Sequence, residues 1–243
     1  MSSSGRDTIY FISDAHFGVG VKPPDYRVEH FRDLTAQMCK RATDLFIVGD
    51  LFDFWIEYRF AIRPDYFPVL HELYRLVESG VKIHYLAGNH DFALSPFLEK
   101  TMGISVYHDT LQLELQGRKV YLSHGDGILG YRISKVLLRN KLFQKLYKIL
   151  HPNIGVAFGI YCSKLSRKYS VRRLTPETIE KYRGAAHKIM KQKTHDLVIF
   201  GHTHHGEICK FDEGEYCNTG AWMNHYNYAV MCDGKIELKT YKK

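Results

Sequence analysis

Short apolar runs rich in β-branched and aromatic residues recur along the chain and predict buried β-strands. Five of these runs are followed directly by polar residues, and they occupy residues 8–12, 45–48, 82–86, 120–122 and 197–200. Between runs, apolar positions at helical spacing predict helices over residues 25–41, 64–79 and 175–193. The last of these begins with Thr175, Pro176 and Glu177, the order typical of a helix N-terminus. Alternating strands and helices predict an α/β fold.

The last third of the chain has a different pattern. Short strand-like runs separated by turns occupy residues 207–210, 216–217, 228–232 and 235–241. Residues 111–115 and 119–122, joined around Gln116 and Gly117, predict a further hairpin. Because hairpins pair their strands antiparallel, we expect mixed sheets, which adds α+β character to the α/β fold.

Residues 128–175 interrupt the alternation of strands and helices. The apolar pattern there predicts two helices, over residues about 131–150 and 154–169, joined by a turn at residues 151–153. We expect a helical insertion, here called the cap, within a single domain spanning residues 1–243.

The cap also carries the positive charge of the chain. The net charge is +8, yet residues 128–175 contain 11 basic residues and no Asp or Glu, so the remainder carries a net charge of −3. The basic residues are Arg132, Lys135, Arg139, Lys141, Lys145, Lys148, Lys164, Arg167, Lys168, Arg172 and Arg173. Such a concentration of charge needs an explanation of its own.

Composition excludes several classes of protein. An apolar fraction of 45% is that of a globular chain and not of a disordered one. No run reaches the roughly 18 apolar residues of a membrane span, and no signal-peptide segment opens the sequence. Five cysteines without C-x-x-C spacing do not predict a disulfide framework or a zinc ribbon. We therefore expect a soluble, intracellular protein.

Polar motifs stand at the ends of the five predicted strands. They are Asp14-Ala15-His16, Gly49-Asp50-Leu51-Phe52-Asp53, Gly88-Asn89-His90-Asp91, Ser123-His124-Gly125-Asp126 and Gly201-His202-Thr203-His204. In open α/β sheets, residues that follow the strands gather along one edge, where ligands bind. Carboxylates, imidazoles and an amide form a mixed oxygen and nitrogen site that suits Mn²⁺, Fe²⁺ or Zn²⁺.

Together these motifs resemble those of the calcineurin-like metallophosphoesterases. The resemblance spans Asp14 to His204 and implies a four-layer αββα sandwich of two mixed sheets. It also implies two divalent cations that share the Asp50 carboxylate. One cation would be held by Asp14, His16, Asp50 and His204, and the other by Asp50, Asn89, His124 and His202.

The resemblance also implies a mechanism. Two cations about 3.5–4 Å apart can activate a shared water as hydroxide and hold the phosphoryl oxygens. His90 would neutralise the phosphoryl group or protonate the leaving group, and Asp91 would orient His90 by hydrogen bonding. Asn89 would contact the substrate as well as a metal. Asp53 would contact the metal ligands without binding a metal itself.

Three interpretations of the cap compete: a solvated helix pair, a nucleic-acid surface and an acyl-chain clamp at a membrane. Its apolar residues decide, because a nucleic-acid surface does not need so broad an apolar face. They include Leu137, Leu138, Leu142, Phe143, Leu146, Ile149, Ile154, Phe158 and Tyr161. A basic, strongly apolar helix pair fits a membrane interface. We therefore predict a lipid-handling cap and no nucleic-acid partner.

Within the superfamily the chain resembles the UDP-2,3-diacylglucosamine hydrolases of lipid A synthesis, which carry an apolar helical insertion after the same histidine. This resemblance implies cleavage of a nucleotide-linked diacyl sugar to UMP and 2,3-diacylglucosamine 1-phosphate, with Mn²⁺ as the usual metal. It also implies peripheral association with the cytoplasmic face of the inner membrane. Lys164 and Arg167 are candidates for phosphate or sugar contacts.

One position departs from that family, whose best-known members have Arg where this chain has His90. A soluble nucleotide phosphodiesterase or phosphomonoesterase, with the insertion as a plain lid, is therefore an alternative. A non-catalytic scaffold is a second alternative, which the complete ligand set disfavours. His205 and His225 lie near the motifs, and a structural role for them is favoured over substrate contact.

Overall fold

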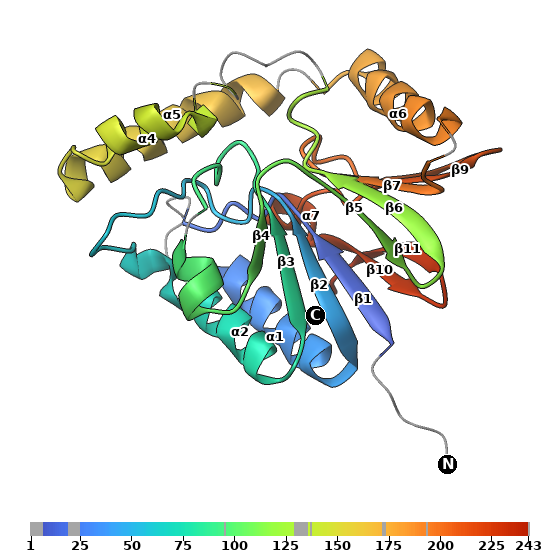
Figure 1. Cartoon of the computed structure of the whole chain (residues 1–243), viewed down its shortest axis with the longest axis horizontal. Coiled ribbons are helices and arrows are strands. Elements are labelled where there is room, and N and C mark those ends of the chain that lie inside the picture. Colours follow the sequence, from blue (N-terminus) through green and yellow to red (C-terminus); the bar gives the residue numbers. More distant parts are fainter. Residues whose placement is uncertain are drawn as a thin grey trace.

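The computed structural model describes residues 7–18, 25–94, 96–128, 136, 138–171, 174–192 and 194–242, and for residues 167–171 it describes the backbone alone. Within this part of the chain, two mixed sheets lie face to face with helices on their outer sides (Figure 1).

The first sheet has six strands in the order β11-β10-β1-β2-β3-β4. Strands β1 to β4 are parallel, and β10 pairs antiparallel with both β1 and β11. Their bounds are β1 (Thr8–Ile12), β2 (Ala42–Val48), β3 (Lys82–Leu86), β4 (Ser105–Tyr107), β10 (Asn227–Cys232) and β11 (Lys235–Thr240).

The second sheet has five strands in the order β5-β6-β7-β9-β8. Its centre is parallel, since β7 pairs in parallel with β6 and β9, whereas β5 and β8 pair antiparallel at the edges. The bounds are β5 (Thr110–Leu115), β6 (Arg118–Ser123), β7 (Leu197–Phe200), β8 (Glu207–Phe211) and β9 (Gly214–Asn218).

Apolar clusters between the layers confirm the four-layer αββα sandwich. Helices α1 (Tyr26–Arg41) and α2 (Phe67–Glu78) pack against the outer face of the first sheet through one cluster, which includes Phe31 and Leu73. A second cluster lies between the sheets, where Phe46 stacks on Phe11. Helix α6 (Pro176–Lys191) covers the second sheet. The alternation along each strand explains this arrangement, because successive side chains face opposite layers.

Most predicted elements are present close to their predicted bounds. All five motif-bearing strands form, and the hairpin at residues 111–122 is confirmed as β5 and β6. Three short elements were not predicted: β4, a π-helical turn at Phe97–Thr101 and the single-turn helix α7 (Trp222–His225). Each is too short to produce a periodic pattern.

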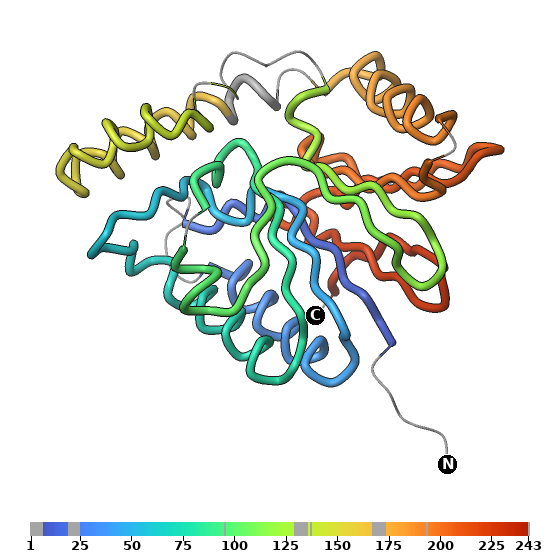
Figure 2. Tube along the Cα trace, in the orientation of Figure 1, coloured from blue at the N-terminus to red at the C-terminus, as the bar shows by residue number. Residues whose placement is uncertain are grey.

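The predicted cap helices correspond to α4 (Lys141–Tyr147) and α5 (Pro152–Val171). The prediction of one helix over residues about 131–150 is wrong, because Asn140 has extended backbone and its side chain caps the start of α4. Helix α5 begins at Pro152, two residues earlier than predicted. The prediction placed Pro152 in the turn between the two helices, but proline is also favoured in the first turn of a helix. The predicted start of the first cap helix falls among residues 129–135, outside the described residues. Figures 1 and 2 place α4 and α5 above the edge where the loops after β1, β2 and β3 emerge.

Among the described helices, none combines the length and the apolar character needed to cross a membrane.

Candidate metal centre

The five motifs converge at one edge of the sandwich, at the ends of β1, β2, β3, β6 and β7 (Figure 2). The backbone turns sharply there. Eight described non-glycine residues have a positive φ, and five of them are predicted ligands: Asp14, His16, Asp50, His202 and His204. This conformation is strained for residues with a Cβ and is found most often at functional sites. The strain therefore coincides with the proposed ligands.

The loop after β1 supplies Asp14 and His16, and its backbone is held from two sides. Ser13 and Asp14 accept hydrogen bonds at their carbonyls from the backbone N–H groups of Trp222 and Met223. The buried guanidinium of Arg27, on α1, donates to the carbonyl of His16 at 3.3 Å. These bonds fix the backbone of two proposed ligands that stand only two residues apart.

Asp50 lies at the centre of the ligand cluster. Its Oδ1 accepts the backbone N–H of His90 at 2.8 Å, and its Oδ2 lies 3.2 Å from His124 Nε2 and 3.9 Å from His16 Nε2. A Cβ on Gly88 would lie 2.1 Å from Asp50 Oδ1, so the glycine of the third motif leaves room for this carboxylate.

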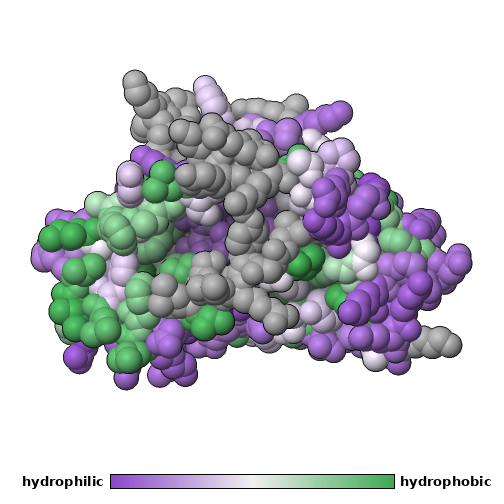
Figure 3. Space-filling view, turned by 90° about the horizontal axis from the view of Figure 1, so that it is seen from above, coloured by the Kyte–Doolittle hydropathy of each residue, from purple (hydrophilic) through white to green (hydrophobic). Residues whose placement is uncertain are grey.

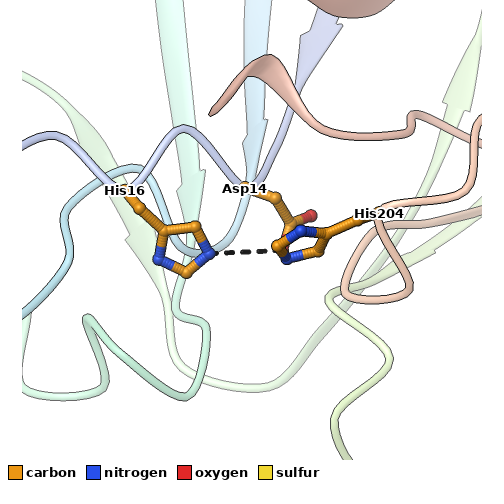
Figure 4. Close-up of side chains that lie close together, drawn as sticks. All are labelled: Asp14, His16 and His204. Atoms are coloured by element: carbon orange, nitrogen blue, oxygen red, sulfur yellow. Dashed lines mark ion pairs between the residues drawn. The ribbon is translucent and has the colours of Figure 1, made fainter. Parts of the chain in front are cut away.

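Among the described residues, three groups have candidate ligand atoms within 4.8 Å of one another: Asp14, His16 and His204; Asp50, His124 and His202; and His16, Asp50 and His90. The first two groups fall within the two proposed ligand sets, and the third links them and includes His90. Figure 4 shows the first group, in which the Asp14 carboxylate faces the imidazoles of His16 and His204. Asn89 joins the second group, with its Oδ1 3.2 Å from His124 Nε2. The structure thus brings all seven predicted ligands together; their roles stay proposals.

The unsatisfied atoms of this cluster fit bound cations. Asp14 Oδ1 and both ring nitrogens of His16 are buried without a hydrogen-bond partner. Buried polar atoms are almost always paired, so Asp14 Oδ1 and the one His16 nitrogen that carries a lone pair are suited to metal coordination. His124 Nδ1 lies 2.8 Å from the Val48 carbonyl and donates to it, which leaves Nε2 as the nitrogen that would coordinate a cation after losing its proton. The donor set contains only oxygen and nitrogen.

Electrostatics also favour cations at this position. Burial opposes ionisation of Asp14, but the adjacent His204 outweighs it and lowers the pKa of Asp14 to about 2. Burial and the neighbouring His124 lower the pKa of His202 to about 4. Burial also keeps the pKa of His16 well below its usual value. Asp14 is therefore ionised, and His16 and His202 are neutral, the protonation states that metal ligands need.

His90 lies beside the cluster, and its ring packs edge-on against His16 with centroids 4.7 Å apart. Its Nδ1 is 2.9 Å from the Asp53 carbonyl and 2.9 Å from Ser163 Oγ. Ser163 in turn donates to Asp53 Oδ1 at 2.6 Å. Ser163 comes from α5 in the cap and was not predicted, because an isolated serine within an apolar helix has no distinguishing sequence signal.

The expectation that Asp91 orients His90 by a hydrogen bond is corrected by the structure. Asp91 instead accepts the backbone N–H groups of Asp50, Leu51 and Gly88, and the Tyr85 hydroxyl at 2.6 Å. The side chains of adjacent residues diverge here, so Asp91 points under the loop after β2 while His90 points toward the cap. Asp91 is therefore placed to hold the Asp50 loop.

The remaining predicted residues lie at the margin. Lys164 is exposed on α5, and the side chain of Arg167 lies outside the described residues. His205 is partly exposed, with Nε2 4.0 Å from Glu207 Oε2, and His225 is exposed on α7. Neither histidine belongs to the ligand groups found among the described residues.

Comparison with known proteins agrees with this geometry. The family model described as calcineurin-like phosphoesterase matches residues 8–206. The chain belongs to this family. It is therefore a phosphoesterase enzyme, and the family implies divalent metal ions.

Relatives of this phosphoesterase extend the comparison over nearly the whole chain. The UDP-2,3-diacylglucosamine hydrolase of Porphyromonas gingivalis is 32% identical over 97% of this chain and 98% of its own. The enzyme of the same name from Pseudomonas putida is 31% identical over 83% and 84%. An archaeal phosphodiesterase structure, 14% identical, covers 96% of this chain and 99% of its own with a TM-score of 0.52, which supports the fold alone.

We predict that metal binding releases protons from this phosphoesterase. Burial opposes protonation of His124, but Asp50 outweighs it and raises the pKa of His124 to about 10, so the metal-free ring is protonated at neutral pH. Coordination through Nε2 displaces that proton, and metal affinity should rise with pH. Calorimetric titration of Mn²⁺ at pH 7.5, in buffers that differ in ionisation enthalpy, should show at least one proton released. Heats that do not depend on the buffer would contradict the assignment.

We predict that Asp91→Asn lowers metal affinity about 10- to 100-fold, because an amide nitrogen cannot accept the N–H groups that position the Asp50 loop. Equilibrium dialysis against Mn²⁺ measures the effect. Tyr85→Phe, which removes only one donor to Asp91, is the matched control and should weaken binding less. Full metal affinity combined with lost activity would instead restore a direct role of Asp91 toward His90.

Proposed function

We propose that this phosphoesterase hydrolyses the pyrophosphate of UDP-2,3-diacylglucosamine to UMP and 2,3-diacylglucosamine 1-phosphate. The observation that carries the proposal is an exposed apolar and basic cap directly above the clustered ligands. The full-length similarity to hydrolases of this name supports the same substrate. A small nucleotide would not need so much exposed apolar surface beside the reacting phosphates.

The cap helices expose apolar side chains at helical spacing. On α4, Leu142 and Leu146 are 65% and 58% exposed, and Ile149, just after this helix, is 79% exposed. On α5 the exposed series is Ile154, Phe158, Tyr161 and Leu165. Figure 3 shows apolar residues gathered over this side of the molecule, whereas hydrophilic residues dominate the other side. Surfaces of this kind mark sites of interaction with lipid or protein.

Basic side chains accompany the apolar surface and favour a lipid interface. Lys141, Lys145 and Lys164 are exposed on the same two helices. Each basic residue near anionic headgroups contributes about 1 kcal/mol, and each buried lipid CH₂ about 0.8 kcal/mol. Acyl chains held by the cap could thus supply much of the binding energy. We propose that the enzyme acts while bound peripherally to the cytoplasmic face of the inner membrane.

In the proposed mechanism, Asp14, His16, Asp50 and His204 would hold one cation, and Asp50, Asn89, His124 and His202 would hold the other. Bound divalent cations, of which Mn²⁺ is our choice, would supply a nucleophile at neutral pH and positive charge for the phosphoryl oxygens. His90 contacts the phosphoryl group beside them. Asp91 holds the Asp50 loop, and Lys164 and Arg167 are proposed to contact substrate phosphate or sugar.

We predict that the purified enzyme with Mn²⁺ releases UMP from UDP-2,3-diacylglucosamine and that Asp50→Ala abolishes this release. The substitution removes the carboxylate shared by both ligand sets, so the loss should reach several orders of magnitude. Chromatographic detection of UMP measures the reaction, and circular dichroism checks the fold. Turnover of small nucleotides without turnover of the diacyl substrate would favour the soluble phosphodiesterase alternative.

We also predict that the cap binds lipid. The double substitution Ile154→Glu and Phe158→Glu should reduce co-sedimentation with vesicles containing anionic lipid at least tenfold, because it places two charges on the apolar face. Hydrolysis of bis(p-nitrophenyl) phosphate, which has no acyl chain, should be unchanged. Tyr74→Glu, at an exposed aromatic residue on α2, is the control. Equal vesicle binding by all variants would exclude the cap as the membrane contact.

A further inference from the structure

Helix α5 has a second face, opposite in character to its apolar one. Gly155, Gly159 and Ser163 follow one another at intervals of four residues and are all buried. A Cβ on Gly155 would lie 2.0 Å from the Tyr58 hydroxyl, and a Cβ on Gly159 would lie 2.3 Å from the Phe54 ring. The helix therefore lies directly on the chain that follows the Asp50 motif.

This close approach brings Ser163 into the metal centre. Its side chain is buried, and its Oγ lies 2.6 Å from Asp53 Oδ1 and 2.9 Å from His90 Nδ1. The hydroxyl donates its hydrogen to the carboxylate, so toward His90 it is an acceptor. Ser163 is thus a polar contact between the cap and the side chain that we place beside the substrate phosphate.

The contacts of His90 define which ring nitrogen is available for the reaction. The Asp53 carbonyl can only accept, so His90 Nδ1 carries a hydrogen and donates to it at 2.9 Å. Ser163 Oγ accepts the same hydrogen, so His90 Nδ1–H is shared between two acceptors. Nε2 is then left for the metal centre, where a His90 ring nitrogen lies within 4.8 Å of ligand atoms of His16 and Asp50.

We propose that Ser163 is a positioning residue that acts through His90: docked by Gly155 and Gly159, it fixes the His90 ring so that Nε2 faces the phosphoryl group. The inference rests on the proposed role of His90 but not on the identity of the lipid substrate. It makes the cap part of the catalytic apparatus as well as a lipid surface.

The test is a double-mutant cycle with bis(p-nitrophenyl) phosphate and Mn²⁺. Ser163→Ala should lower kcat about tenfold with little change in KM, since one positioning hydrogen bond is lost while substrate contacts remain. In the His90→Ala background the same substitution should have no further effect on kcat. Ser166→Ala, at an exposed serine on the same helix, is the matched control and should behave as wild type.

A second variant should disturb the hydrogen bonds of Ser163 without replacing a polar side chain. Gly159→Ala should push α5 away from Phe54 and reproduce the kcat loss of Ser163→Ala. Gly184→Ala on α6, where a Cβ would meet nothing within 4 Å, controls for glycine replacement in a helix.

Three results would overturn the inference: equal losses with and without His90, a loss expressed as raised KM, or a loss confined to the diacyl substrate. The last two would mean that Ser163 binds substrate directly. Because the small diester has no acyl chain, failure of the proposed lipid substrate would leave this test intact.

Discussion

The burial of two ionised carboxylates, Asp14 and Asp50, is the constraint on which the rest of the structure depends. Burying unpaired charge is very costly. The surrounding imidazoles offset only part of that cost, because several of them must stay neutral to coordinate a metal ion. The divalent cations that the family implies would supply the missing compensation. Several features support these side chains: left-handed backbone at five proposed ligands, glycine beside Asp50 and a buried Arg27 that holds the His16 carbonyl.

The fold could be predicted where the sequence carries long periodic signals. Strands such as β2 and β7 are nearly continuous apolar runs because they are covered on both faces, and a motif after each strand located the site at one edge. The bounds of α5 were less certain, since Pro152 can either end a turn or open a helix. Strand β4 has three residues and takes its place only through pairing with β3.

The proposed ligands could be selected from the sequence, whereas the residues that hold them in place could not, for a physical reason. A ligand must be a His, Asp or Asn at a strand end, so residue type and position together reveal it. A supporting residue is defined by its partner. Asp91 is adjacent to His90 in sequence, yet alternate side chains diverge, and it serves the backbone of Asp50 instead. Ser163 lies 110 residues from Asp53 in sequence, and only the packing of α5 brings the two together.

Helix α5 contributes both to the proposed lipid surface and to the proposed catalytic site. Acyl chains need a broad apolar surface, whereas phosphoryl transfer needs side chains held in fixed positions. The helix meets both by placing large apolar residues on one face and Gly155, Gly159 and Ser163 on the other. Because a Cβ on Gly159 would lie 2.3 Å from the Phe54 ring, the small face of α5 leaves little room for the helix to move relative to Phe54. If the cap binds acyl chains as proposed, a shift of its apolar face would also move the Ser163 hydroxyl, and lipid binding would be coupled to the position of His90.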